Sequence, residues 1–206
     1  KLINRKGTTE GKNTVSDYRP IETERGISVN ASLLYTIYND KKINILDTPG
    51  YFDFVGEVEE AVSAADAAII VISGKAGVEV GTLKAWELCD KYKLPRMVYV
   101  SEMDVDNASF KNVVEDLTER YGKKIAPFHF PIRENEKFVG YVNVVSETGY
   151  RWQGKDALED SIPDYSTSYL ETYRETLMEA VAETSEEMMD RYFSGETFSP
   201  DEIRAA

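Results

Sequence analysis

The residues of this sequence that could do chemistry gather in the tetrapeptide Asp47-Thr48-Pro49-Gly50, which directly follows the apolar run at residues 43–46. An aspartate carboxylate can hold a water bound to Mg²⁺, and a glycine lets its backbone N–H approach a terminal phosphate because no Cβ is in the way. Asp-x-x-Gly alone is a weak signal, since Asp and Gly occur in turns of every kind. The tetrapeptide therefore indicates a phosphate and metal site only if the surrounding elements agree.

The elements around this tetrapeptide are predicted to be strands that alternate with helices. Strands are expected at residues 32–38, 42–46, 67–73, 96–101 and 125–130, and helices at about 56–65, 79–92 and 108–121. The first two strands flank the turn Asn39-Asp40-Lys41 and should form an antiparallel pair. The alternation predicts an α/β fold with parallel strands covered by helices on both faces. It also places Asp47 at the carboxyl end of a strand, where ligand crevices lie in such sheets.

The chain changes character on either side of this core. Residues 1–30 are polar and lack periodicity, which predicts a loop. A strand pattern at 138–145 among glycines and charged residues indicates a small β-rich insert, and the remainder is strongly helical. Helix breaks are expected near Ser185 and Ser194-Gly195, with a new helix start at Ser199-Pro200-Asp201-Glu202. The predicted domains are a core at 1–130, an insert at 131–162 and a helical continuation at 163–206.

Composition bounds the class of protein. A chain of 206 residues with 42% hydrophobic residues can bury an ordinary core. The formal net charge of -13 argues against a nucleic-acid-binding domain, because phosphate neutralisation needs clustered Lys and Arg. The apolar run at 67–72 is too short to cross a bilayer, so a cytoplasmic location is expected. The single cysteine, Cys89, and the single histidine, His129, are predicted to be a buried core thiol and a structural strand residue.

Four segments in register resemble the motifs of translational GTPases. The string Asp47-Thr48-Pro49-Gly50-Tyr51-Phe52-Asp53-Phe54 resembles their switch II, and Glu24-Arg25-Gly26-Ile27-Ser28-Val29 resembles the end of their switch I. Gly77-Val78-Glu79 is similar to the loop before the next helix, and Ser101-Glu102-Met103-Asp104 stands where the family carries its guanine-reading Asn-Lys-x-Asp. Their order and spacing, the insert and the helical tail resemble elongation factor G over about residues 8–206.

The resemblance implies a three-layer, P-loop-GTPase-like mixed sheet and a site for GTP or GDP with Mg²⁺. It assigns nucleotide binding to Asp47, Gly50, Ser101 and Asp104, the metal to Ser28 and Asp47, and the attacking water to Tyr51. The implied partner is the ribosome, with neither a membrane nor a free nucleic acid bound by this chain. The implied function is that of the GTP-binding domain of an elongation factor G-like protein, which couples GTP hydrolysis to ribosomal translocation.

The sequence departs from the family at the phosphate-binding loop, Gly-x-x-x-x-Gly-Lys-Ser/Thr. Only residues 7–13 come near it, and they are one residue short, end in Asn13 and lack a preceding apolar strand. We therefore expect a fragment that begins after this loop, stops before the last guanine-pocket loop and is inactive without the α- and β-phosphate cradle.

Substitutions at the site favour further alternatives. Tyr51 replaces the histidine of most family members, and its phenol is a poor base, so hydrolysis is expected to be slower or differently triggered. Ser101 replaces the Asn, and Glu102 puts a carboxylate where a Lys packs along the base, which predicts weaker guanine selectivity. The alternatives left open are a ribosome-protection or recycling factor of the same family, and a GTPase fold kept as a non-hydrolysing docking module.

Overall fold

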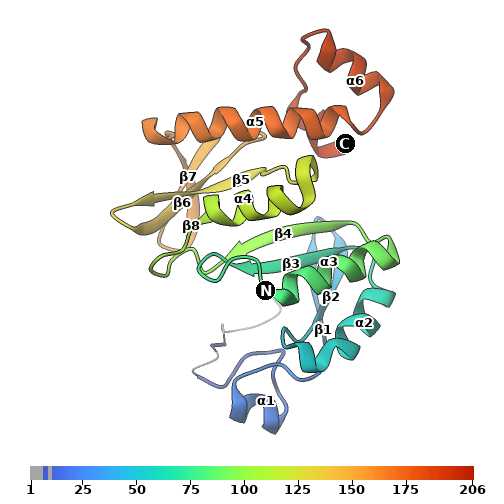
Figure 1. Ribbon diagram of the computed structural model, residues 1–206. Helices are drawn as coiled ribbons and strands as arrows, with labels where there is room; N and C mark the ends of the chain where they lie inside the picture. The colour runs from blue at the N-terminus through green and yellow to red at the C-terminus, as the bar shows by residue number, and fades with distance from the viewer. Residues whose placement is uncertain (1–6, 9–10) are drawn as a thin grey trace. The chain divides into compact units, whose positions relative to one another are not determined.

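The structure, a computed structural model, describes residues 7–8 and 11–206 (Figure 1). The chain divides into two compact units. The first consists of Lys1–Val71 with Glu79–Tyr99, and the second of Ile72–Val78 with Val100–Ala206. Helices and strands mix in both units, which confirms the predicted α/β fold class. The domain boundaries predicted at residues 130 and 162 stay a prediction.

The first unit opens with a helix where the sequence predicted a loop. Helix α1 (Pro20–Arg25) has proline at its first turn and ends at Gly26, whose φ of 68° is left-handed. The prediction of a structureless 1–30 segment was therefore wrong over these six residues. A helix this short shows no hydrophobic period, and its Glu22 carboxylate accepts from the Arg19 amide before the helix and from the Val29 and Asn30 amides after it.

The strand pair that precedes the Asp47 turn forms as predicted. Strands β1 (Ser32–Tyr38) and β2 (Lys41–Asp47) are antiparallel, with Ser32 opposite Asp47 and Tyr38 opposite Lys41. The two connecting residues, Asn39 and Asp40, have φ values of 47° and 58°. Asn and Asp adopt this left-handed region more readily than most residues, and a two-residue turn of this kind matches the twist of paired strands.

Strands β3 (Ala68–Ser73) and β4 (Arg96–Ser101) form a second two-stranded sheet. The Ala68 amide donates to Pro95 O and the Gly74 amide donates to Ser101 O, and both bonds join residues 27 positions apart (95 − 68 and 101 − 74). Because donor and acceptor numbers rise together, the two strands are parallel. Helix α2 (Val55–Ala64), which follows the short 3₁₀ turn η1 (Phe52–Phe54), precedes β3, and helix α3 (Val80–Tyr92) connects β3 to β4.

Helices bury one face of this strand pair within the part of the chain that the structure describes. Ile70 is buried, as are Trp86 and Cys89 of α3, so the predicted core thiol is confirmed. On β3 the alternate residues Ile69 and Val71 are 63% and 61% exposed. The expectation of helices on both faces therefore holds here for one face only.

The second unit centres on a four-stranded antiparallel sheet in the order β5-β6-β7-β8 (Figure 1). Its strands are β5 (His129–Glu134), β6 (Lys137–Asn143), β7 (Thr148–Gln153) and β8 (Asp156–Asp160). Its helices are α4 (Phe110–Tyr121), α5 (Thr167–Ala182), α6 (Glu186–Phe193) and α7 (Pro200–Ala205), with 3₁₀ turns η2 (Gly122–Lys124) and η3 (Asp164–Ser166).

Helix α5 lies along this sheet and supplies half of the core (Figure 1). Ile132 and Val142 of the sheet are fully buried in one cluster with Leu177 and Ala182 of the helix. The strand predicted at 125–130 begins only at His129, because the 3₁₀ turn η2 and Pro127 precede it, and proline has no N–H for a ladder. The predicted helix breaks and the helix start at Ser199-Pro200 are confirmed.

Candidate functional site

The Asp47 turn lies where the sequence predicted it. Asp47 is the last residue of β2 and is half-buried, and Pro49 behind it is buried. The strand register places Ser32 opposite Asp47, so the segment that enters β1 and the turn that leaves β2 lie at the same end of the strand pair. Residues 28–31 and 48–50 are thereby brought to one edge of the first unit.

Gly50 is exposed, and a Cβ built on it would meet no atom of the described residues within 4 Å. Its φ does not lie in the left-handed region either. Nothing in the local fold of the unliganded chain therefore requires glycine at this position. A close approach by a ligand is the physical reason that would require it.

Tyr51 is the N-cap residue of the 3₁₀ turn η1 that leads into α2, and its side chain is 57% exposed. The phenol is therefore open to water at the end of the turn. Its chemistry fits a hydrogen bond to a water molecule, whereas an imidazole base would be a stronger proton acceptor. The structure places Tyr51 next to the Gly50 amide in the chain, as the motif requires.

Ser28 is already hydrogen-bonded in this structure. Its hydroxyl donates to Asp17 Oδ1 at 2.6 Å. The residues that follow Ser28 are held by two carboxylates that the sequence analysis did not single out, Glu22 on α1 and Glu57 on α2. The signal for Glu22 was local, because a glutamate three positions into a helix can accept from the amide that precedes the helix.

Glu22 is a buried carboxylate satisfied by backbone donors. It is 1% exposed, and it accepts from the amides of Val29, Asn30 and Arg19, each at 3.1 Å. Burial raises its pKa, but the three amides together lower it more, so the pKa lies below its ordinary value of 4.5. The group is therefore ionised at neutral pH and holds the loop to α1.

The segment that resembles the guanine-reading motif belongs to the second unit. Ser101 Oγ donates to Ile72 O at 3.3 Å, and Ser101 O accepts from the Gly74 amide at 2.8 Å. The Glu102 carboxylate accepts from the Ser73 hydroxyl, with Glu102 at a left-handed φ of 55°. Asp104 is exposed. Ser101 and Glu102 thus have hydrogen-bond partners within the protein, whereas among the described residues the exposed Asp104 carboxylate has none.

Gly74 and Arg133 support this loop, and the sequence analysis missed both. A Cβ on Gly74 would lie 2.6 Å from Met103 Sδ and 3.1 Å from Ser101 O, so a larger residue there would require the Met103 side chain to move. Arg133 of β5 donates through Nη1 to Met103 O at 3.1 Å and to Ala108 O at 2.9 Å. Arg133 lies about 30 positions from its acceptors, and no local sequence pattern reports such a pairing.

The hydroxyl of Ser28 and the carboxylate of Asp47 are oxygen groups of the kind that Mg²⁺ accepts. Magnesium takes one or two protein oxygens and completes its shell with water and substrate phosphates. The described residues hold no group of three or more His, Cys, Asp or Glu side chains that could cage a metal ion. A hydroxyl and a carboxylate at one edge of the unit therefore fit a metal held jointly with a nucleotide, and the Ser28 oxygen keeps lone pairs for it while its hydrogen is donated to Asp17.

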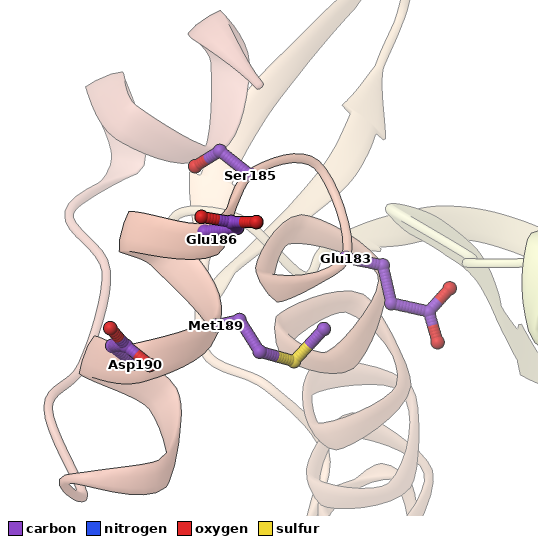
Figure 2. Close-up of a pocket in the computed structure, with 5 residues that line it drawn as sticks. All are labelled: Glu183, Ser185, Glu186, Met189 and Asp190. Carbon is purple, nitrogen blue, oxygen red and sulfur yellow. The ribbon is translucent and has the colours of Figure 1, made fainter.

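A hollow in the second unit lies apart from these positions in the sequence. It is lined by Glu183, Ser185, Glu186, Met189 and Asp190 at the junction of α5 and α6 (Figure 2). Figure 2 shows the Glu183 carboxylate directed away from those of Glu186 and Asp190. The three acids do not converge, so this hollow offers no ligand set for a cation.

His129 is the first residue of β5, which confirms the predicted strand histidine. Its ring lies 4.9 Å from that of Phe128 and 5.2 Å from that of Tyr141, between ring centroids. The His129 side chain is exposed overall, and partial desolvation lowers its pKa, which favours the neutral ring at neutral pH.

Within the described residues no helix is long and apolar enough to cross a membrane.

Comparison with known proteins finds matches over most of the chain. A family model described as the elongation factor Tu GTP binding domain matches residues 1–191. An elongation factor G-like protein from Thermotoga maritima is 35% identical over 91% of this chain and 27% of its own length. Elongation factor G 1 from Syntrophomonas wolfei is 35% identical over 95% of this chain and 29% of its own length.

Two further relatives extend the comparison. The mitochondrial ribosome-releasing factor 2 of Drosophila grimshawi is 40% identical over 73% of this chain and 20% of its own length. A crystal structure of a Thermus thermophilus protein superposes with a TM-score of 0.90 at 32% identity, covering 98% of this chain and 30% of that one. The chain thus spans less than a third of the length of these relatives. It belongs to the elongation factor Tu GTP-binding domain family, and within it to the elongation factor G group of translational GTPases.

Proposed function

We propose that the protein binds GTP and Mg²⁺ at the edge formed by residues 28–31 and 47–50, and that it acts on the ribosome in the cytoplasm as a GTP-driven factor. The observation that supports this most directly is the register that sets Ser32 opposite Asp47. It sets the segment that carries Ser28 at the end of β2 that carries Asp47 and Gly50, and a hydroxyl, a carboxylate and a glycine amide are groups that a metal-bound phosphate needs.

Each residue has a separate role in this proposal. Asp47 holds a water of the metal shell, Ser28 offers its hydroxyl to the metal, and the Gly50 amide donates to the terminal phosphate. Tyr51 orients the attacking water, and Asp104 accepts from the N–H groups of the base. When bound, Mg²⁺ supplies charge neutralisation at the phosphates. Hydrolysis is expected to depend on positioning more than on a strong base, so Tyr51 is compatible with activity.

The test is a titration of the full-length protein with a fluorescent GTP analogue, followed by GTP hydrolysis with and without ribosomes. Asp47→Asn should weaken Mg²⁺-dependent GTP binding at least about tenfold, which corresponds to roughly 1.4 kcal/mol. Asp40→Asn, the same change in the turn at the far end of β2, is the matched control and should bind normally. Equal binding by both variants would contradict the assignment of Asp47.

The 206-residue chain by itself should bind GTP weakly, because its sequence holds no complete phosphate-loop pattern. Titration of this chain beside the full-length protein tests the point. Tight saturable binding by the chain alone would show that the phosphates have another partner within it.

The ribosomal step separates two forms of the proposal. Relatives named elongation factor G match the chain, as do relatives named ribosome-releasing factor 2. Translocation should be accelerated by the protein in the first case, and disassembly of post-termination ribosomes in the second. A factor that stimulates neither step and hydrolyses no GTP on the ribosome would instead fit a docking module, the alternative that the hydrogen-bonded Ser101 and Glu102 favour.

A further inference from the structure

Three consecutive backbone amides next to Ser28 donate to carboxylates on two different helices. The Val29 and Asn30 amides donate to Glu22 Oε1, each at 3.1 Å. The Ala31 amide donates to Glu57 Oε2 at 2.7 Å. Residues 27–31 belong to no helix or strand, so these bonds are the backbone's partners in this stretch. The position of the chain after Ser28 is therefore set by two side chains.

The side chain of Asn30 joins the same two helices. Its Oδ1 accepts from Arg19 Nη1 at 2.7 Å, next to α1, and its Nδ2 donates to Glu57 Oε1 at 3.1 Å on α2. Both oxygens of Glu57 are thus used, one by a backbone amide and one by a side-chain amide. Bonds to an ionised carboxylate are stronger and more directional than bonds between neutral groups.

Helix α2 is also the element that follows the Gly50 turn. The 3₁₀ turn η1 begins two residues after Gly50, and α2 begins at Val55, directly after η1. Glu57 lies in the first turn of this helix. A shift of the Gly50 turn toward a bound phosphate would move the first turn of α2, and Glu57 would pass that shift to Asn30 and Ala31.

We propose that Glu57 is a positioning residue that couples the Gly50 turn to Ser28 through its two hydrogen bonds to Asn30 and Ala31. The inference rests on the proposed GTP function. The Ser28 hydroxyl donates to Asp17, and its oxygen keeps lone pairs that can face a metal ion. Glu57 carries the movement of α2 to a point three residues from that hydroxyl, while Glu22 holds the adjacent amides to α1.

A two-state coupling of this kind affects triphosphate and diphosphate binding unequally. The terminal phosphate is the group that orders switch segments in GTPases, so a coupling residue should matter for GTP and much less for GDP. A residue with a purely structural role would weaken both nucleotides alike. The ratio of the two affinities therefore separates the two roles.

The variant that tests this is Glu57→Gln in the full-length protein. A glutamine keeps the size of the side chain but has one acceptor oxygen, so its NH₂ group would face one of the two donors. The matched control is Glu60→Gln, the same change on an exposed position of the same helix. For both variants, affinities for GDP and for a non-hydrolysable GTP analogue are measured by fluorescence titration.

Glu57→Gln should lower the ratio of GTP-analogue affinity to GDP affinity at least about fivefold, whereas Glu60→Gln should leave it unchanged. Hydrogen exchange of peptides that cover residues 27–33 provides a second readout without nucleotide, and should be several times faster in Glu57→Gln. Faster exchange with an unchanged ratio, or unchanged exchange, would overturn the coupling role. Absence of nucleotide binding by the unsubstituted protein would overturn the proposed function and the role that rests on it.

Discussion

At the proposed base site, Glu102 is bound to a neighbouring loop of the protein. Its carboxylate accepts from the Ser73 hydroxyl, whose oxygen in turn accepts from the Ala76 amide at 3.1 Å. Glu102 thus joins the loop after β4 to the loop after β3 by a hydrogen bond. The family carries a lysine at the position of Glu102. Under the proposed function, guanine selectivity is therefore expected to depend mainly on Asp104.

Restoring the family residues should sharpen base selection. The double variant Ser101→Asn, Glu102→Lys introduces an amide beside the base and a cation along its face, so the preference for GTP over ATP should rise about tenfold, roughly 1.4 kcal/mol. Competition between ATP and a fluorescent GTP analogue on the full-length protein measures it. Ser101→Ala is the control, because it adds neither group. An unchanged preference in the double variant would show that positions 101 and 102 do not contact the base.

The ionised carboxylate of Glu22 should make the stability of the fold depend on pH in the acid range. Its pKa is below 4.5 in the folded chain, since the amides of Val29, Asn30 and Arg19 outweigh the effect of burial. Because the pKa of Glu22 is lower in the folded than in the unfolded chain, its ionised form stabilises the fold at pH values above the unfolded-state pKa of 4.5. This contribution is lost as pH falls below about 4.5 toward the folded-state pKa. Glu22→Gln should cost about 1–3 kcal/mol at pH 7 and less at pH 3. Urea unfolding at the two pH values measures the difference, and an equal cost at both would contradict the prediction.

At the scale of elements, α6 and α7 are joined by one arginine. Arg191 donates to Glu202 Oε1 at 2.7 Å and to Glu196 Oε2 at 3.0 Å. Glu202 also accepts from the Ser199 amide at 2.8 Å, so a single carboxylate caps α7 and links it to α6. The hydrogen bond from Arg191 lowers the pKa of Glu202 most, and the two hydrogen bonds from Ser199 lower it further, to about 2.

This link should persist in acid and depend on the carboxylate. Because the pKa of Glu202 is lowered, the stability that its ionised form contributes is fully present above pH 4.5, the ordinary pKa of the group. That stability is lost as pH falls through about 2, the pKa in the folded chain. Glu202→Gln should speed amide hydrogen exchange in residues 199–205 at neutral pH. Asp201→Asn, on the neighbouring exposed position, should have a smaller effect. Equal exchange in the two variants would show that the Arg191 bond does not hold α7.

At the scale of the whole molecule, the 206-residue chain combines a net charge of -13 with exposed apolar side chains. Strands β3 and β4 expose Ile69, Val71, Met97 and Tyr99, each by at least 45%. Neighbouring exposed apolar residues form the kind of patch that binds hydrophobic dyes. The chain studied alone should therefore bind a naphthalene sulfonate dye in its folded state.

Replacing part of this patch should reduce the signal. The double variant Ile69→Thr, Met97→Thr should lower dye fluorescence by about half, because threonine keeps strand propensity while removing apolar surface. Phe193→Ser on α6 is the control, since Phe193 is 78% exposed but lies outside the strand pair. Similar losses in both variants would show that the dye does not report on β3 and β4.

Local patterns were sufficient for much of the fold and for the position of the Asp47 turn. The strands at 32–38 and 96–101 have the predicted bounds, because short β-branched and aromatic runs between turn residues leave little choice of structure. The sequence analysis missed helix α1 because six residues are too few for a hydrophobic period to appear. The Glu22 carboxylate of this helix is bound by residues that follow the helix in the loop.

By itself, the sequence determined the family, the strand pair and the carboxyl-end position of Asp47, since these follow from motif order and from neighbours along the chain. Only the tertiary structure decided that Ser28 is bound to Asp17, that Ser101 and Glu102 are hydrogen-bonded within the protein, and that Glu57 reaches the Ala31 amide. The reason is distance in the chain: the Glu57 and Ala31 partners are 26 positions apart, and hydrogen bonds between distant residues form only once the backbone has brought them together.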